Sequence, residues 1–436
     1  MSTTEKVRAT ERLAELREAY ARKRPKARAC HERAQQWMPG GNTRSVLHFD
    51  PFPFVVASGR ADTLTDIDGF DYIDCAGEFS AGLYGHSDPV IMSAMREALD
   101  RGLVLCGPTT AESELAALLC QRFPSVERIR FCNSGTEANL FSLLTAIIAT
   151  GRKRILVFDG GYHGGVLTFA GGGSPMNVPF EFVVAPYNDI EATCACIAAN
   201  AADLAAILIE PLLGAAGNIP GDARFLQTLR AEATRVGAML IFDEVKTSRL
   251  GRAGLQGHYG VVPDMTSLGK YLGAGLSFGA FGGRKELMQR YDPRRADALK
   301  HAGTFNNNVM SMSGGLAGLR SVFTPEAADA FLQRTEAFRI SLNERFAAAG
   351  AGVRLSGIGS ILSLHLGEHV PTRISEIDPA TSGFRLLVHM ACLERGLALT
   401  PRGDIFLSLP MGEARLAAIA DILFDVAVGE RMGLSG

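Results

Sequence analysis

The feature that most constrains this 436-residue chain is a regular alternation of two kinds of segment, which begins near residue 88. Helical segments of ten to fifteen residues are separated by short runs rich in aliphatic and β-branched residues. Such runs are typical of strands buried on both faces, and their alternation with helices favours a mostly parallel sheet covered by helices. The predicted strands are 129–132, 154–158, 180–185, 205–210, 238–243 and 277–282.

The two ends of the chain depart from this pattern. Residues 4–37 predict a helix that ends at Pro39-Gly-Gly41. Residues 51–75 show an alternating pattern and contain turn signals, which together indicate short antiparallel strands. After Thr324 the sequence predicts a long helix to residue 349, strands over 354–366, and helices over 382–395 and from 412. The predicted fold class is α/β, with a large domain over 71–323. A smaller α+β domain combines 324–436 with the N-terminal segment 1–70.

Composition excludes several classes of protein. Hydrophobic residues at 47% and charged residues at 21% suit a globular chain, and a net charge of −2 provides no field that would attract nucleic acid. The one basic region, 6–33, is interspersed with acids, which predicts a solvated helix face. No run approaches the roughly 20 apolar residues of a membrane helix, and no signal peptide is seen, so we predict a cytoplasmic protein without a membrane partner. The eight cysteines have neither zinc nor redox spacing, which predicts reduced thiols and no metal.

Two residues together point to one kind of cofactor. Asp243 ends the apolar run 238–243, and Lys270 follows a glycine at the end of 264–270. An acid at a strand end can keep a pyridine nitrogen protonated, and a lysine after a small residue can form a Schiff base. This pair predicts a site for pyridoxal phosphate (PLP), with Val245 packed under the cofactor ring. A solvent-exposed turn acid is the alternative for Asp243.

A second motif fits the cofactor's phosphate. The predicted strand 129–132 leads through Asn133 into Ser134-Gly135-Thr136 and then into an apolar helix. A helix start offers N–H groups and a partial positive charge, and small residues let a phosphate approach. The alternative is an ordinary capping box, since Ser134 precedes Glu137 by three residues.

Two further loops carry weaker signals. Tyr162 lies within Gly160-Gly-Tyr-His-Gly-Gly165, where flanking glycines would let a flat ring stack on the aromatic side chain. A glycine-rich surface turn is the alternative there, and His163 could be a supporting or merely structural residue. Thr304 precedes three asparagines at 306–308, which could contact phosphate or simply form a turn rich in local hydrogen bonds.

In this order, these stretches resemble the class III aminotransferases of PLP fold type I, over roughly residues 39–410. The resemblance implies that Lys270 forms the Schiff base, that Asp243 pairs with the pyridine nitrogen, and that Tyr162 stacks on the ring. It implies that Ser134, Gly135 and Thr136 hold the phosphate. It also implies that Thr304 reaches the phosphate of a neighbouring subunit, in a homodimer with shared active sites. Its substrates would be small amino acids and keto acids.

Within the family, two subgroups compete. The segments 42–46 and 303–308 resemble the β-amino-acid aminotransferases, of the β-phenylalanine kind, more than the glutamate-1-semialdehyde aminomutases, which remain the alternative. The resemblance implies that Arg44 binds a substrate carboxylate and that Arg402, in a mobile loop, binds the carboxylate of the amino acceptor, 2-oxoglutarate or pyruvate, in a ping-pong reaction. Arginine suits both roles because it pairs with carboxylates bidentately. Residues predicted to line the apolar pocket are Phe79, Val46, Tyr84, Leu213 and Ala215.

Overall fold

The computed structural model describes residues 3–435, which form two compact units. Unit 1 contains the described residues up to Ser87, then Arg334–Pro371, and the described residues from Ser375 onward. Unit 2 contains Asp88–Gln333 and Thr372–Ile374. The divisions therefore lie at other residues than the predicted domain boundaries, after residues 70 and 323. The second division falls within a single helix, α11 (Pro325–Ala348), which no local sequence signal interrupts.

Unit 2 is built on a seven-stranded sheet in the order β4-β12-β11-β10-β7-β5-β6. Only β12 runs antiparallel to its neighbours within the described sheet, so the predicted α/β class with a mostly parallel sheet is confirmed. The strands are β4 (Arg128–Cys132), β5 (Arg154–Phe158), β6 (Glu181–Ala185), β7 (Leu204–Ile209), β10 (Met239–Asp243), β11 (Met265–Gly269) and β12 (Gly279–Gly283).

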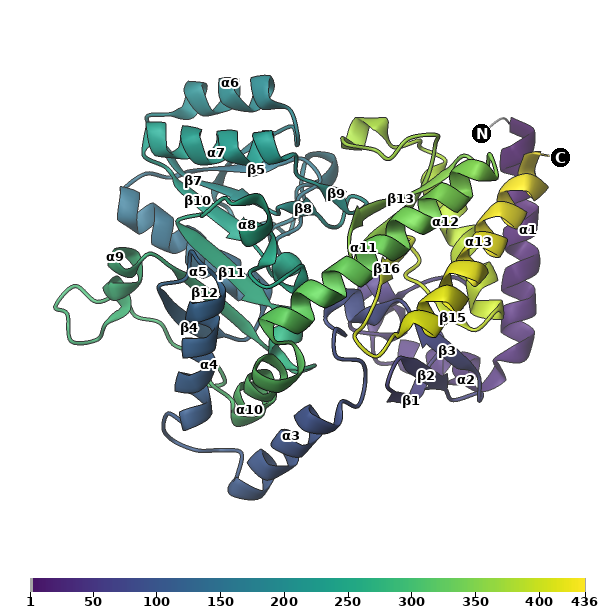
Figure 1. Cartoon of the computed structure of the whole chain (residues 1–436), viewed down its shortest axis with the longest axis horizontal. Helices are drawn as coiled ribbons and strands as arrows, with labels where there is room; N and C mark the ends of the chain where they lie inside the picture. Colours follow the sequence, from purple (N-terminus) through teal and green to yellow (C-terminus); the bar gives the residue numbers. More distant parts are fainter. Residues whose placement is uncertain (1–2, 436) are drawn as a thin grey trace. The chain divides into compact units, whose positions relative to one another are not determined.

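Helices cover both faces of this sheet. Helix α5 packs on β7, β11 and β12, and α7 packs on β7 and β10 beside α6 (Figure 1). Side chains alternate along a strand, and Ile241 belongs to the core cluster that includes Ala138 and Leu143 of α5. Asp243 is therefore on the α5 side of the sheet. The helices are α3 (Pro89–Arg101), α4 (Thr110–Arg122), α5 (Gly135–Thr150), α6 (Ile190–Asn200), α7 (Ala223–Val236), α8 (Gly254–Tyr259), α9 (Lys285–Met288) and α10 (Val309–Ala317).

Strand β11 was absent from the predicted strands. It carries Thr266 and Ser267 in a fully buried segment, so it has no apolar run that would indicate a strand. Each hydroxyl has a partner inside the protein: Thr266 Oγ1 lies 2.7 Å from Ser125 Oγ, and Ser267 Oγ lies 3.1 Å from Ser142 Oγ. Tertiary hydrogen bonds offset the cost of burying these hydroxyls, which local sequence does not reveal.

Unit 1 combines two small sheets with long helices. In the first sheet β1, β2 and β3 form an antiparallel meander, and β15 pairs with β3 in parallel. The second sheet has the strand order β13-β14-β16. Helices α1 and α13 lie side by side (Figure 1). The elements are α1 (Thr3–Lys23), α2 (Pro25–Gln35), β1 (Val56–Arg60), β2 (Thr63–Asp66), β3 (Asp71–Asp74), β13 (Val353–Ile358), β14 (Ile361–Leu366), α12 (Thr381–Glu394), β15 (Leu397–Ala398), β16 (Asp404–Phe406) and α13 (Glu413–Ser435).

The prediction of a single helix over 4–37 is wrong in one respect, because the helix is interrupted at Arg24. Pro25 disfavours helical backbone in the residue before it, and Arg24 has φ −124° and ψ 61°. The proline then serves as the first residue of α2, a position that needs no N–H donor. No helix within residues 3–435 has the length and apolar character that crossing a membrane requires.

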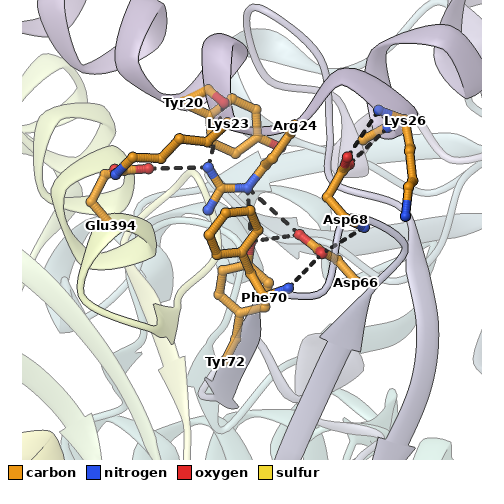
Figure 2. A network of polar contacts seen from close by, with 10 residues as sticks. Tyr20, Lys23, Arg24, Lys26, Asp66, Asp68, Phe70, Tyr72 and Glu394 are labelled. Atoms are coloured by element: carbon orange, nitrogen blue, oxygen red, sulfur yellow. Dashed lines mark hydrogen bonds and ion pairs between the residues drawn. The ribbon is translucent and has the colours of Figure 1, made fainter.

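Arg24 also departs from the solvated face predicted for the basic region, since it is only 1% exposed. Figure 2 shows its guanidinium beside the rings of Tyr20 and Phe70, with Cζ 4.2 and 4.5 Å from their centroids. Its Nε donates to Tyr72 Oη over 2.8 Å, and Nη1 donates to Glu394 Oε1 over 3.0 Å. The break at Pro25 thus coincides with a buried cation that joins α1 to β3 and α12.

Candidate functional site

Asp243 is a buried carboxylate whose hydrogen bonds come from three directions within unit 2. Asn139 Nδ2, on α5, donates to Asp243 Oδ2 over 2.8 Å, and the Val245 N–H donates to Oδ1 over 3.0 Å. His163 Nδ1 lies 2.8 Å from Oδ2. An ionised carboxylate only accepts, so this contact needs a hydrogen on Nδ1. The alternative of an exposed turn acid is therefore wrong for Asp243, since its side chain lies in the interior.

The helix start at Ser134 is both a capping box and a cradle of small residues. Ser134 Oγ accepts from the Glu137 N–H over 3.2 Å, and Glu137 Oε2 accepts from the Asn133 N–H over 2.9 Å. The Ser134 hydroxyl can still donate its own hydrogen to an anion. The N–H groups of Gly135 and Thr136 belong to the first turn, which a helix cannot satisfy internally. The interpretation of this motif as a capping box is therefore compatible with its interpretation as a phosphate site.

Four glycines make space around this helix start. A Cβ on Gly135 would lie 2.7 Å from Val245 Cγ1, and one on Gly164 would lie 2.6 Å from Thr136 Cβ. A Cβ on Gly279 would run into the Ser134 carbonyl. Gly269 is in contact with the same Val245 side chain, because its Cβ would lie 3.1 Å from Cγ1. These close approaches bring the Ser-Gly-Thr segment, Val245 and the residue before Lys270 together.

Lys270 stands at the end of β11 with a positive φ of 56°, which is uncommon for a residue other than glycine. The next residue anchors this conformation, since Tyr271 is fully buried and its Oη donates to the Ser248 carbonyl over 3.0 Å. Strained backbone held by its surroundings is frequent at functional sites. Lys270 itself is half-buried.

Tyr162 has an exposed side chain and a tightly held backbone. Its N–H donates to Glu210 Oε1 over 3.0 Å, while Glu210 Oε2 accepts from the Gly214 N–H over 3.1 Å. Glu210 is buried, and burial raises its pKa, although nearby His163 and Lys246 act in the opposite direction. The glycine-rich turn is therefore anchored by the side chain of Glu210, which directly follows strand β7.

The loop around Thr304 is ordered by its three asparagines. Asn306 Oδ1 accepts from Asn133 Nδ2 over 2.9 Å, Asn307 Nδ2 donates to Glu112 Oε2 over 3.0 Å, and Asn308 caps α10 by accepting from the Ser311 N–H. Of these bonds only that of Asn308 is local in sequence, because Asn306 and Asn307 bond to residues 173 and 195 positions away. Asn306 also ties the loop to Asn133, next to the Ser-Gly-Thr segment. Thr304 itself is exposed in the turn.

Unit 1 brings Arg44, Arg402 and Phe79 together. Each guanidinium carbon lies 5.4 Å from the centroid of the Phe79 ring, within the range of a cation–π contact. Arg44 also forms an ion pair with Glu78, and Arg402 Nη2 donates to Asp404 Oδ2 over 3.0 Å. Two arginines that are far apart in sequence therefore share one aromatic ring.

The other residues predicted for pocket lining differ in burial. Val46 is exposed in the short helix Ser45–Leu47, whereas Tyr84 and Leu213 are buried, each within its own unit.

Three residues near the predicted site were not assigned from the sequence: Asn139, Glu210 and Glu78. Asn139 carried a usable signal, because it is a polar residue between the apolar residues Ala138 and Leu140, five positions after Ser134. Glu210 follows a fully apolar strand, as Asp243 does, and could have been found by the same argument. Glu78 has no such signal, because its importance depends on the backbone conformation of its turn.

The chain is similar to known proteins over most of its length. The family model for aminotransferase class III matches residues 47–411. A β-phenylalanine transaminase of Variovorax paradoxus is 48% identical over 403 residues, which cover 92% of each chain, and a glutamate-1-semialdehyde 2,1-aminomutase of Bordetella avium is 36% identical, with 89% of this chain and 96% of the relative covered. The crystal structure of a β-phenylalanine aminotransferase from Variovorax paradoxus superposes with a TM-score of 0.94 at 44% identity, covering 96% of this chain and 97% of the other.

Proposed function

Because the chain belongs to the class III aminotransferases, whose cofactor is PLP, we propose that it transfers the amino group of an aromatic β-amino acid to 2-oxoglutarate or pyruvate. The β-phenylalanine transaminase shares more identical residues with this chain than the aminomutase does, at 48% against 36%. This difference favours intermolecular transfer over isomerisation of one carbon skeleton.

The residues of unit 2 fit PLP. The glycines around Ser134-Gly135-Thr136 leave room that any Cβ would fill, and the hydroxyls and N–H groups there suit a phosphate. Asp243 is a buried acid that needs a cationic partner, and a protonated pyridine nitrogen is one. Ser134, Gly135 and Thr136 would hold the phosphate, with Thr304 supplied by a second subunit. Val245 and Tyr162 would contact the ring. When bound, PLP supplies an electron sink for cleavage at the carbon that bears the amine.

The chain's own residues then have defined tasks. Lys270 Nζ would hold the cofactor, and its amine, when free, would move the proton at the donor carbon that bears the amine. Asp243 holds the ring-nitrogen proton, and Asn139 and His163 keep its carboxylate oriented. The donor's keto product leaves before the acceptor binds, so the same groups act again in the reverse direction on the acceptor.

The observation that carries the substrate assignment is the shared ring of Phe79. A transaminase must bind two different carboxylic acids in turn, and unit 1 provides two guanidinium groups, each 5.4 Å from the same centroid. Arg44 binds the carboxylate of the β-amino acid, and Arg402 binds the carboxylate of the acceptor. Phe79 and Val46 supply apolar surface for an aromatic substituent.

The proposal includes a homodimer with shared active sites in the cytoplasm. Val104 is 96% exposed and Phe305, beside Thr304, is 67% exposed. Large apolar side chains with such exposure suit burial against a second copy. Sedimentation velocity should give a single species of twice the chain mass.

One experiment tests the function. The enzyme, loaded with PLP, is incubated with an aromatic β-amino acid and either 2-oxoglutarate or pyruvate, and glutamate or alanine is measured, with Lys270→Ala as the inactive control. Absence of both products with every aromatic and aliphatic β-amino acid would contradict the proposal. Conversion of glutamate-1-semialdehyde to 5-aminolevulinate instead would assign the chain to the aminomutases.

A further inference from the structure

We propose that the carboxylate of Glu78 pairs with Arg44 in the resting enzyme, and that the carboxylate of the donor must displace it. The inference deepens the proposed function and rests on its assignment of Arg44 to the donor. It makes Glu78 a specificity-determining residue, because only ligands that carry a carboxylate have to compete with it.

The ion pair between Arg44 and Glu78 is of an exchangeable kind. The two side chains are 41% and 60% exposed, and exposed pairs of this type contribute little net free energy because water solvates the separated charges. The backbone of Arg44 is held independently, since its N–H donates to Asn42 Oδ1 over 2.9 Å. The side chain of Arg44 can therefore exchange its ion-pair partner while the backbone of Arg44 keeps its position.

Glu78 is presented by a strained turn rather than by a loose surface loop. The residues Gly77, Glu78, Phe79 and Ser80 have φ values of 50°, 47°, 53° and 78°, a left-handed run that is unfavourable at each position other than glycine. Such a run persists only where its surroundings hold it. The turn places two adjacent side chains, the Glu78 carboxylate and the Phe79 ring, against the same arginine.

Two contacts hold this turn in place. Asp74 Oδ1 accepts from the N–H groups of Ala76 and Gly77 over 3.0 and 2.9 Å. Phe406 packs on the other side, because a Cβ on Gly77 would lie 2.8 Å from Phe406 Cβ. The position of Glu78 beside Arg44 is therefore built into unit 1.

The second arginine makes a useful contrast. Arg402 pairs with Asp404, whose side chain is only 3% exposed, so its partner is part of the interior. Arg44 has a solvated partner that a ligand can replace. Exchanging one carboxylate for another at Arg44 changes the charge contacts little, and the net binding free energy of the donor then depends on its remaining, apolar groups. A small anion that lacks such groups is a poor competitor for Glu78.

The substitution Glu78→Gln tests this inference, since it removes the charge and keeps the side-chain length. We expect the KM of an aromatic β-amino acid, and the Kd of the unreactive acid 3-phenylpropanoate measured by calorimetry, to fall about two- to fivefold. The Kd of the uncharged amide 3-phenylpropanamide should stay the same. The matched control is Glu368→Gln, which removes an exposed acid paired with Arg354 elsewhere in unit 1 and should change neither constant.

Arg44→Gln separates failure of the inference from failure of the proposed function. If this variant weakens donor and 3-phenylpropanoate binding at least tenfold while Glu78→Gln leaves both unchanged or weaker, Glu78 is no competitor and the function stands. If Arg44→Gln has no effect, Arg44 is not the carboxylate site and both assignments fail. In the double variant, the gain from Glu78→Gln should disappear.

Discussion

Asn139 Nδ2 lies 2.8 Å from Asp243 Oδ2, and this hydrogen bond joins helix α5 to the end of strand β10. The same nitrogen donates to the His163 carbonyl over 3.0 Å. One amide group therefore sets both the carboxylate and the backbone of the residue that faces it. The bond also connects the helix that begins with the Ser-Gly-Thr segment to the acid proposed for the cofactor ring.

Replacing Asn139 with alanine should weaken PLP binding. The variant loses a hydrogen bond to a charged group, worth about 1.5–3 kcal/mol, so we expect the Kd of PLP to rise about tenfold or more. The Kd is measured from the visible absorbance of the bound cofactor after dialysis. Ser142→Ala, one turn further along α5, removes a buried hydroxyl contact with Ser267 and serves as the control. Equal PLP affinity in Asn139→Ala and the wild type would contradict this role.

Replacing Gly164 with alanine should destabilise the protein and displace Thr136. The new Cβ would lie 2.6 Å from Thr136 Cβ, at a backbone φ of 127°. Strain and overpacking together should lower the free energy of unfolding by about 2–4 kcal/mol. Gly165→Ala is the matched control, because a Cβ there has no atom within 4 Å. Urea unfolding of both variants measures the difference, and equal midpoints would refute the steric argument.

The buried Arg24 should be important for the stability of unit 1. In Arg24→Met the carboxylates of Asp66 and Glu394 lose their buried cation, so we expect a loss of about 3–5 kcal/mol in the free energy of unfolding. Arg22→Met removes an exposed pair with Glu18 on the same helix and should cost less than about 1 kcal/mol. Thermal unfolding distinguishes the two, and a loss of similar size in both variants would be inconsistent with the network in Figure 2.

His389 should make the protein less stable in mild acid. It is fully buried, its Nδ1 lies 3.0 Å from the Leu399 carbonyl, and burial lowers its pKa from 6.5 to about 4. The unfolded chain takes up a proton below pH 6.5, whereas the folded chain does so only near pH 4, so this contribution to stability is lost as the pH falls through that window. At pH 5 the loss should be about 2 kcal/mol.

The variant His389→Gln tests this pH dependence. It has no titrating group, so its free energy of unfolding should change less between pH 7 and pH 5 than that of the wild type. The exposed His258 offers a control, since His258→Gln should retain the wild-type profile. Parallel profiles for all three proteins would show that other groups cause the acid sensitivity.

Most of the sheet in unit 2 could be predicted, because its strands are apolar and follow helices at regular spacing. Strand β10 ends at Asp243 as predicted, and β5 has the predicted bounds. Strand β11 could not be predicted, because its buried hydroxyls are satisfied by Ser125 and Ser142, which are more than 120 residues away in sequence. In the N-terminal region the proline at 25 was a local signal for a helix break, but the burial of Arg24 depended on rings that the fold brings near.

The sequence by itself determined the family and the kind of chemistry. The Ser-Gly-Thr helix start, Asp243 and Lys270 are local patterns in which each residue type suits one task, so they can be read without a structure. Only the tertiary structure decided how these residues are supported. Asn139 reaches Asp243 across 104 positions, and Arg44 and Arg402 meet at Phe79 from opposite ends of the chain. Such contacts depend on packing and on the left-handed turn at Glu78, and neither leaves a periodic trace in the sequence.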